Sequence, residues 1–162
     1  MDVAEKGRRA RRLPTRQQLA VWRAFIETAE TIRSTTSVPL QATAGLSVGD
    51  YQVLLALSEA EGRCLRSSEL AAGIGWERSR LSHHLGRMEK RGLISRQECK
   101  TDNRGAEVHL TEQGDKAFRK GSRPHLECIR EQFVDVLTDE QLDQLAVITS
   151  RLGAALEAGS AK

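Results

Sequence analysis

The stretch ERSRLSHHLGRMEKRGLISR (77–96) has helical spacing together with an unusual polar face. Leu85 and Met88 fall within about 40° of Leu81 when each residue advances by about 100° around a helix. These three side chains predict a helix with one buried stripe. Opposite the stripe and flanking that side lie small polar residues and cations, namely Ser79, Arg80, Ser82, His83, Gly86, Arg87 and Lys90, with Arg78 nearer the buried edge.

The segments on either side of this helix predict a winged helix-turn-helix. SSELAAGIG (67–75) reads as a short helix that Ser67 caps and that ends at Gly73 and Gly75. After Gly92, LISRQE (93–98) and AEVHLT (106–111) have strand character and flank a turn, KTDNRG (100–105). A helix, a short strand, two further helices and a hairpin, in that order, are typical of the winged motif.

The polar face of the 77–96 stretch suits the major groove of DNA. Small residues let a backbone come close to the bases, and guanidiniums reach guanine edges or phosphates. Gly86 in mid-helix costs about 1 kcal/mol relative to Ala, and close approach to a partner is a reason to tolerate that cost. The alternative is an ordinary surface helix that happens to be basic. At the hairpin tip, Arg104 is suited to a narrow minor groove, and a plain surface turn with a local ion pair is the alternative.

Three motifs with the right order and spacing carry a family resemblance. They are EKRGLI (89–94), DNRG (102–105) and VHLTEQG (108–114). With them, roughly residues 47–118 resemble the MarR family of bacterial winged-helix regulators. The resemblance implies a homodimer that binds a palindromic operator in double-stranded DNA, usually as a repressor. It also implies release by a small-molecule effector, commonly a phenolic compound.

The predicted DNA-binding residues come from three elements. Base readout is assigned to the helix, phosphate contact to Arg78 and to the start of the preceding helix, and minor-groove contact to Arg104. The full set is Ser67, Ser68, Arg78, Ser79, Arg80, Ser82, His83, Arg87, Lys100 and Arg104. For the effector, Trp22, Phe25 and Tyr51 are candidate pocket residues, with plain core packing as the alternative.

The fold class is mainly α (α+β), with helices on both sides of the winged unit. We expect a basic arm over 1–14, an N-terminal dimerisation helix and linker over 15–46, the winged domain over 47–111 and C-terminal dimerisation helices over 112–158. The first helix should end near Pro39, and the helix that Thr111 caps should break or kink around GSRP (121–124).

Apolar side chains on the flanking helices predict pairing of two chains. A capping box is predicted at Ser47 and Asp50, where the helix before the winged motif starts, and another at Thr138 and Gln141, where the last helix starts. Its apolar stripe, which is too long to stay exposed, consists of Leu142, Leu145, Ile148, Leu152 and Leu156. Two-fold pairing would bury that stripe and present two recognition helices to two half-sites.

Positive charge is concentrated where the motif lies. Residues 63–105 carry ten basic and five acidic groups, a net +5, and residues 1–16 carry a net +4, while 17–62 and 106–162 are each at −3. This distribution favours a polyanionic partner. A winged-helix protein-interaction module, or an anti-regulator that does not bind DNA, is the rival function.

The remaining sequence excludes several classes. No apolar run is long enough to cross a membrane, and the N-terminus does not read as a secretory signal, so we expect a bacterial cytoplasmic, nucleoid-associated protein. No motif of an enzyme or a cofactor site is present. Cys64, Cys99 and Cys128 read as reduced thiols; a thiol switch, and a zinc site at His125 and Cys128, are lesser alternatives.

Overall fold

The computed structural model of the protein describes residues 13–98 and 106–160. Its helices are α1 (Arg16–Ala44), α2 (Val48–Glu59), α3 (Ser67–Gly73), α4 (Arg78–Lys90), α5 (Glu112–Ile129) and α6 (Asp139–Ser160). Its strands are β1 (Cys64–Arg66), β2 (Ile94–Glu98) and β3 (Ala106–Leu110), and short turns form η1 (Glu61–Arg63) and η2 (Arg130–Val134). The predicted sites at Lys100 and Arg104, and Cys99 beside them, lie outside the described residues.

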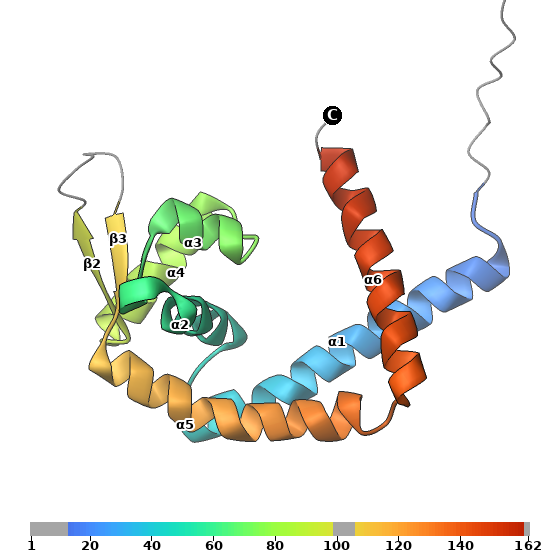
Figure 1. Ribbon diagram of the computed structural model, residues 1–162, viewed down its shortest axis with the longest axis horizontal. Coiled ribbons are helices and arrows are strands. Elements are labelled where there is room, and N and C mark those ends of the chain that lie inside the picture. The colour runs from blue at the N-terminus through green and yellow to red at the C-terminus, as the bar shows by residue number, and fades with distance from the viewer. Residues whose placement is uncertain (1–12, 99–105, 161–162) are drawn as a thin grey trace, which may run out of the picture.

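The strands and α2–α4 form one lobe, the predicted winged helix-turn-helix (Figure 1). The sheet is antiparallel with the order β1-β3-β2. Val108 in the central strand lies opposite Leu65 of β1 and Arg96 of β2. The predicted hairpin and the mainly α fold class are therefore confirmed.

The buried stripe of α4 is the one that the sequence predicts. Leu81 and Leu85 are each 1% exposed and Met88 is 0% exposed. They belong to a core with buried side chains of α2, α3 and the sheet, which include Leu54, Leu57, Leu70, Ile94 and Val108. Burying each such side chain stabilises the fold by about 1.5–3 kcal/mol. This packing holds α4 so that its opposite, polar face points toward solvent.

Capping residues set four of the helix starts, two of them through the predicted reciprocal boxes and that of α1 through a further box of Thr15 and Gln18. Ser47 and Asp50 cap α2, and Thr138 and Gln141 cap the start of α6. Thr111 accepts the backbone N–H of Gly114 at the start of α5. The predicted cap at Ser67 is wrong: the helix starts one residue earlier, and the Glu69 carboxylate accepts the backbone N–H of Arg66.

Helix α1 does not end at Pro39, contrary to the prediction; it continues to Ala44. Proline removes the N–H that would bond the carbonyl of Thr35. Helix α5 approaches that point with two side chains. The Cys128 thiol lies 3.9 Å from the Thr35 carbonyl oxygen, and His125 Nδ1 donates to the next carbonyl, that of Thr36, at 2.6 Å. Donors from another helix thus compensate the proline.

Helix α5 is likewise continuous through Pro124, so it is not broken at 121–124. The helix is held there against α1, where Gly121 is buried. A Cβ on Gly121 would lie 3.2 Å from the Ala44 Cβ, which shows how closely the two helices approach. The departure from α-helical geometry comes later, in the π turn η2.

Helices α1, α5 and α6 extend beyond the winged lobe. Helix α1 packs along α5, whereas α6 stands away from the lobe (Figure 1). Within the described ranges, α6 packs extensively on no other element of its own chain and contains no buried residue. Among these helices none is long and apolar enough to cross a membrane.

Candidate nucleic-acid interface

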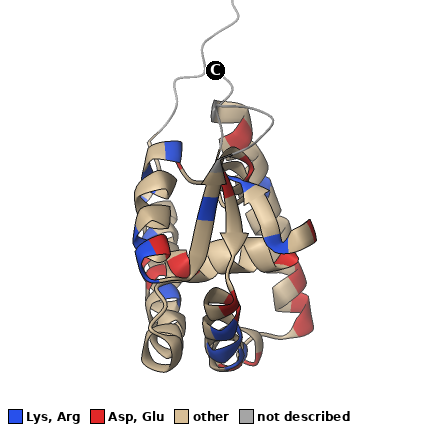
Figure 2. Cartoon of the chain, turned by 90° about the vertical axis from the view of Figure 1, so that its left-hand side faces the viewer, with Lys and Arg blue, Asp and Glu red and all other residues tan. Residues whose placement is uncertain are grey.

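The predicted DNA-contacting side chains of α4 form one exposed surface. Every one of Arg78, Ser79, Arg80, Ser82, His83 and Arg87 is exposed, because the buried stripe occupies the other side of the helix. A Cβ on Gly86 would meet no atom within 4 Å, so the helix surface is open at that point. Figure 2 shows the charged positions from the side of β2 and β3.

A hollow with both polar and apolar lining joins this surface to α3 and the sheet. It has a volume of about 240 Å³. Its lining comes from α3, α4, β2 and β3 and consists of Ser67, Ser68, Arg78, Leu81, Ser82, Leu85, Arg96 and Ala106. Four of the predicted DNA-contacting residues therefore lie around one groove, although Ser67 and Ser68 are 10 or more positions from the others in the sequence.

An ion pair ties β2 to α4 beside this groove. Arg96 donates from Nε and Nη2 to the same carboxylate oxygen of Glu89, at 2.9 and 2.6 Å, and its backbone N–H donates to the other oxygen at 3.0 Å. These hydrogen bonds lower the pKa of Glu89 below its ordinary value. Both side chains are partly exposed, so the contact orients the strand more than it stabilises the fold.

The indole of Trp76, just before α4, holds one of the arginines. The guanidinium carbon of Arg80 lies 4.1 Å from the centre of the Trp76 ring, a cation–π contact. The Trp76 ring meets the His84 ring edge-on, with 5.1 Å between their centroids. The direction of Arg80 is thus set by a residue outside the helix.

His84 holds the second arginine. Arg87 Nη2 lies 2.9 Å from His84 Nδ1, and since a guanidinium only donates, Nδ1 carries the lone pair. His84 Nε2 lies 3.0 Å from Asp50 Oδ1, a short contact outside hydrogen-bond geometry. Burial lowers the pKa of His84; Asp50 opposes this effect, while Arg87 and Arg80 add to it. The imidazole is therefore neutral at neutral pH.

Asp50 connects this cluster to the far end of α4. Its carboxylate accepts from the backbone N–H of Ser47 at 2.9 Å and from Arg91 Nη1 at 2.8 Å. Arg91 Nη2 also donates to the carbonyl of Gly45 at 2.6 Å. We call Asp50, Trp76, His84, Arg87 and Arg91 the α2–α4 clamp.

The rings of the clamp pack closely on a glycine in the first turn of α2. A Cβ on Gly49 would lie 2.8 Å from Trp76, closer than real Cβ atoms come, and 3.0 Å from His84, a tight contact. The absence of that carbon lets both rings pack directly on the α2 backbone. Gly49 thus permits the two rings to support the basic face of α4.

The clamp predicts a pH effect on stability. Because the pKa of His84 is lower in the folded state than its ordinary 6.5, the neutral ring favours folding. This contribution is present above pH 6.5 and is lost as pH falls below that value. We expect the unfolding free energy of the wild type, measured with urea, to be lower at about pH 5.5 than at about pH 7.5. In His84→Gln this drop between the two pH values should be smaller.

The exposed neighbour His83 provides the matched control. His83→Gln removes the same ring from the same helix and should keep the wild-type difference between the two pH values. An unchanged difference in His84→Gln would contradict the assignment of this effect to His84. Asp50 does not interfere, because its pKa lies below 3.8.

The three candidate effector residues do not come together within one chain. Trp22 and Phe25 lie on the exposed first part of α1, with 6.5 Å between their ring centroids. Tyr51 is buried against Phe118 and against His125, which bonds to Thr36. Trp22 and Thr36 are separated by about 21 Å of helix. Tyr51 therefore packs as core, far from the other two.

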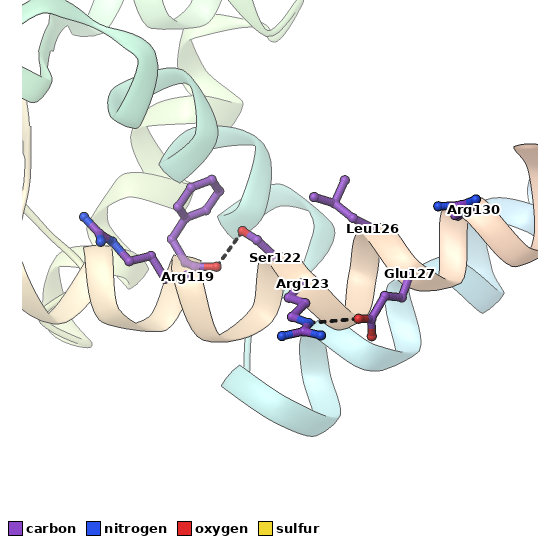
Figure 3. Close-up of a pocket in the computed structure, with 7 residues that line it drawn as sticks. Arg119, Ser122, Arg123, Leu126, Glu127 and Arg130 are labelled. Atoms are coloured by element: carbon purple, nitrogen blue, oxygen red, sulfur yellow. Dashed lines mark hydrogen bonds and ion pairs between the residues drawn. The ribbon is translucent and has the colours of Figure 1, made fainter.

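A shallow hollow of about 490 Å³ lies instead along α5 (Figure 3). Its lining residues are Phe118, Arg119, Ser122, Arg123, Leu126, Glu127 and Arg130. Arg123 Nε donates to Glu127 at 2.9 Å, and the Ser122 hydroxyl donates to the Phe118 carbonyl at 2.6 Å. Since all lining residues come from α5 and η2, the hollow is open on one side.

The winged lobe with long flanking helices recurs among solved structures. The crystal structure of AbsC, a MarR family transcriptional regulator from Streptomyces coelicolor, superposes with a TM-score of 0.85 at 34% identity, over 91% of this chain and 99% of AbsC. The chain belongs to the MarR family. A sequence model of the MarR family matches residues 44–105, the winged part of this MarR-family regulator.

Two further relatives agree with this assignment. Sco3205, a MarR family regulator from the same organism crystallised with DNA, has a TM-score of 0.85 and 35% identity, over 90% of this chain and 91% of Sco3205. The transcriptional repressor MprA of Escherichia coli (strain K12) is 31% identical over 108 residues, 67% of this MarR-family chain. That match spans 61% of the length of MprA.

Sequence reasoning about this MarR-family regulator missed most of the clamp. Asp50 was recognised only as a capping residue, and Trp76 and Arg91 were not singled out. One signal was available for His84: it lies three residues after Leu81 and four before Met88, so it borders the buried stripe. A polar ring at the edge of a buried face requires a polar partner.

Proposed function

We propose that the protein represses transcription by binding a palindromic operator in double-stranded DNA as a homodimer. The observation that carries this proposal is the exposed, arginine-bearing face of α4, with Arg80 and Arg87 held by Trp76 and His84. Such a face provides bidentate donors at a fixed position, as readout of guanine in the major groove requires. A regulator of this kind would act in the bacterial cytoplasm.

The groove beside α4 suits the DNA backbone. Ser67 and Ser68 offer hydroxyls and the first turn of α3, while Arg78 adds a cation. Phosphate contacts of this kind set the register of a recognition helix, and base contacts give specificity. In the proposed complex Lys100 and Arg104 contact DNA from the hairpin, with Arg104 in the minor groove.

The apolar surfaces of α1 and α6 support the proposed homodimer. The large side chains exposed on them are Leu19, Val21, Trp22, Phe25, Val38, Val147, Ile148, Leu152 and Leu156. Soluble monomers rarely expose so much continuous apolar surface. In our proposal 15–46 and 112–158 form the dimerisation part, and 47–111 reads the DNA.

An effector site is proposed between the dimerisation part and the lobe. The open hollow along α5 becomes enclosed only when another surface covers it, and the exposed aromatic side chains of α1 are available in a partner chain. Trp22 and Phe25 would then line the site with residues of α5. A phenolic ligand suits aromatic walls with nearby arginines.

The function is tested by DNA affinity as salt varies. Genomic fragments selected by the purified protein supply the operator, and fluorescence anisotropy gives the dissociation constant. Several phosphate contacts give a steep fall of log K with log salt. Arg80→Ala should weaken operator binding by about 1–3 kcal/mol, roughly 5- to 150-fold, because a bidentate base contact is lost.

Lys116→Ala is the matched control, since it removes one positive charge from an exposed ion pair on α5. It should leave operator affinity nearly unchanged. No selected fragment together with a flat salt dependence would support the rival, a winged-helix module that binds proteins. Equal losses for Arg80→Ala and Lys116→Ala would mean that only net charge matters, and would remove α4 from base readout.

A further inference from the structure

Three metal-ligating side chains meet on the outer face of the sheet, away from the base-reading face of α4. Cys64 of β1 lies directly opposite His109 of β3, and Glu107 is two residues before His109 on the same strand. Side chains two residues apart on a strand share a face, so all three project from the same side. The core residues Leu65 and Val108 occupy the other side.

The two distances from His109 to its neighbours are close to those around one tetrahedral ion. His109 Nε2 lies 3.6 Å from Cys64 Sγ and also 3.6 Å from Glu107 Oε2. The three ligand atoms all lie within 4.8 Å of one another. Zinc binds sulfur at about 2.3 Å and nitrogen at about 2.0–2.1 Å, and tetrahedral angles then place the two atoms about 3.6 Å apart. The corresponding nitrogen–oxygen separation is about 3.4 Å.

We propose that Cys64, Glu107 and His109 bind a divalent metal ion of the zinc class. A thiolate, an imidazole and a carboxylate are the ligand types that zinc takes in proteins, and three protein ligands leave a fourth position for water. The side chains of His109 and Glu107 are 30% and 37% exposed, so an ion can reach them from solvent. A hard cation such as Mg²⁺ would reject the thiolate.

The backbone before Cys64 adopts an uncommon conformation. Gly62 and Arg63 have φ values of 63° and 54°, both in the left-handed region, and Arg63 has a side chain that disfavours it. The Arg63 guanidinium pairs with Asp115 at 3.3 Å, which keeps that cation engaged with α5. Arg66 lies opposite Glu107 in the sheet and is the cation nearest in register to the carboxylate.

Metal binding at this site would join the start of α3 to the wing. Strand β1 leads directly into α3, and β3 is the central strand, which pairs with both β1 and β2. An ion held by both strands restrains the wing relative to the groove that Ser67 and Ser68 line. The binding site itself goes beyond the proposed DNA-binding function and does not depend on it.

Cobalt binding to the chelator-stripped full-length protein tests the proposal. Co²⁺ bound to a thiolate gives a ligand-to-metal charge-transfer band in the near ultraviolet. The wild type should bind one Co²⁺ per chain with this band and release it to Zn²⁺. Cys64→Ser should abolish the band, and His109→Ala and Glu107→Gln should weaken binding by more than about 100-fold, beyond the cost of losing an outer-shell partner.

Cys128→Ser and Cys99→Ser are matched controls that remove a thiol elsewhere, and both should keep the band. Circular dichroism of each variant checks that the fold persists. If His109→Ala unfolds, Cys64→Ser still tests the proposal, because it replaces only a sulfur atom by oxygen. No charge-transfer band in the wild type would overturn the proposal, as would a band that survives Cys64→Ser. Loss of the band in Cys128→Ser alone would place the ion at His125 and Cys128 instead.

Discussion

Ile148→Asp is expected to convert the protein into a monomer. Ile148 is 52% exposed on α6, within a stripe that also contains Leu152 and Leu156. In a two-fold interface one substitution acts twice, because each chain contributes the same residue. Losing two buried isoleucines costs about 4 kcal/mol or more, which weakens dimerisation about a thousandfold, and burying two carboxylates adds to that cost.

Sedimentation equilibrium measures the mass directly, and Ser150→Asp is the control. Ser150 is an exposed polar residue on the other side of α6, so the same charge is added outside the stripe. The Ser150→Asp variant should therefore remain a dimer. A dimeric Ile148→Asp at micromolar concentration would exclude α6 from the interface.

Operator affinity should also fall in Ile148→Asp, because the variant no longer forms the dimer. Two linked recognition helices gain affinity from simultaneous contact with two half-sites, and losing one of them costs about 100-fold or more. Because Ile148 lies outside the core of the winged lobe, circular dichroism should still show a folded helical protein. A monomer that retained full operator affinity would contradict the two-half-site arrangement.

Local patterns were sufficient to predict most of the lobe. The stripe of Leu81, Leu85 and Met88, the hairpin and two capping boxes depend on residues within a few positions of each other. Such signals can be read from the sequence alone, because periodicity and capping depend only on nearby residues. The predicted exposed face of α4 followed from the same stripe.

The wrong predictions have a different cause. The helices continue through Pro39 and Pro124 because another helix supplies donors or close packing at these points, and no local rule describes that. Asp50 and Arg91 are 41 positions apart in sequence. Their pairing required the fold, since many other acid–base pairs were equally available. Trp22 and Tyr51, in contrast, looked alike as aromatic residues but occupy different environments.

Asp50→Ala is expected to lower the free energy of unfolding by about 3 kcal/mol. The side chain is only 3% exposed and has Ser47, His84 and Arg91 as neighbours. Burial would raise the pKa of Asp50, but hydrogen bonds from Ser47 and Arg91 outweigh that effect and hold it below 3.8. Its charge is therefore present at neutral pH, and its removal leaves Arg91 without its carboxylate and the backbone N–H of Ser47 without its acceptor.

Chemical denaturation monitored by circular dichroism gives the change, and Glu112→Gln is the matched control. Glu112 also lies in the first turn of a helix and pairs with Lys116, but both side chains are strongly exposed. Its substitution should change stability by no more than about 0.5 kcal/mol. A similarly small change in Asp50→Ala would show that the clamp adds little to folding.

Asp50→Asn separates charge from shape. The amide oxygen can still accept from Ser47 or Arg91, so the loss should be smaller than for alanine. The stability of the wild type that depends on ionised Asp50 is present above pH 3.8 and disappears as pH falls through the lower folded-state pKa. Asn does not titrate, so this part of the acid sensitivity should be absent in the variant. Operator affinity of the folded Asn variant should also fall, because Arg91 and His84 no longer fix α4 to α2 through a charged group. Wild-type affinity would mean that core packing alone orients the recognition helix.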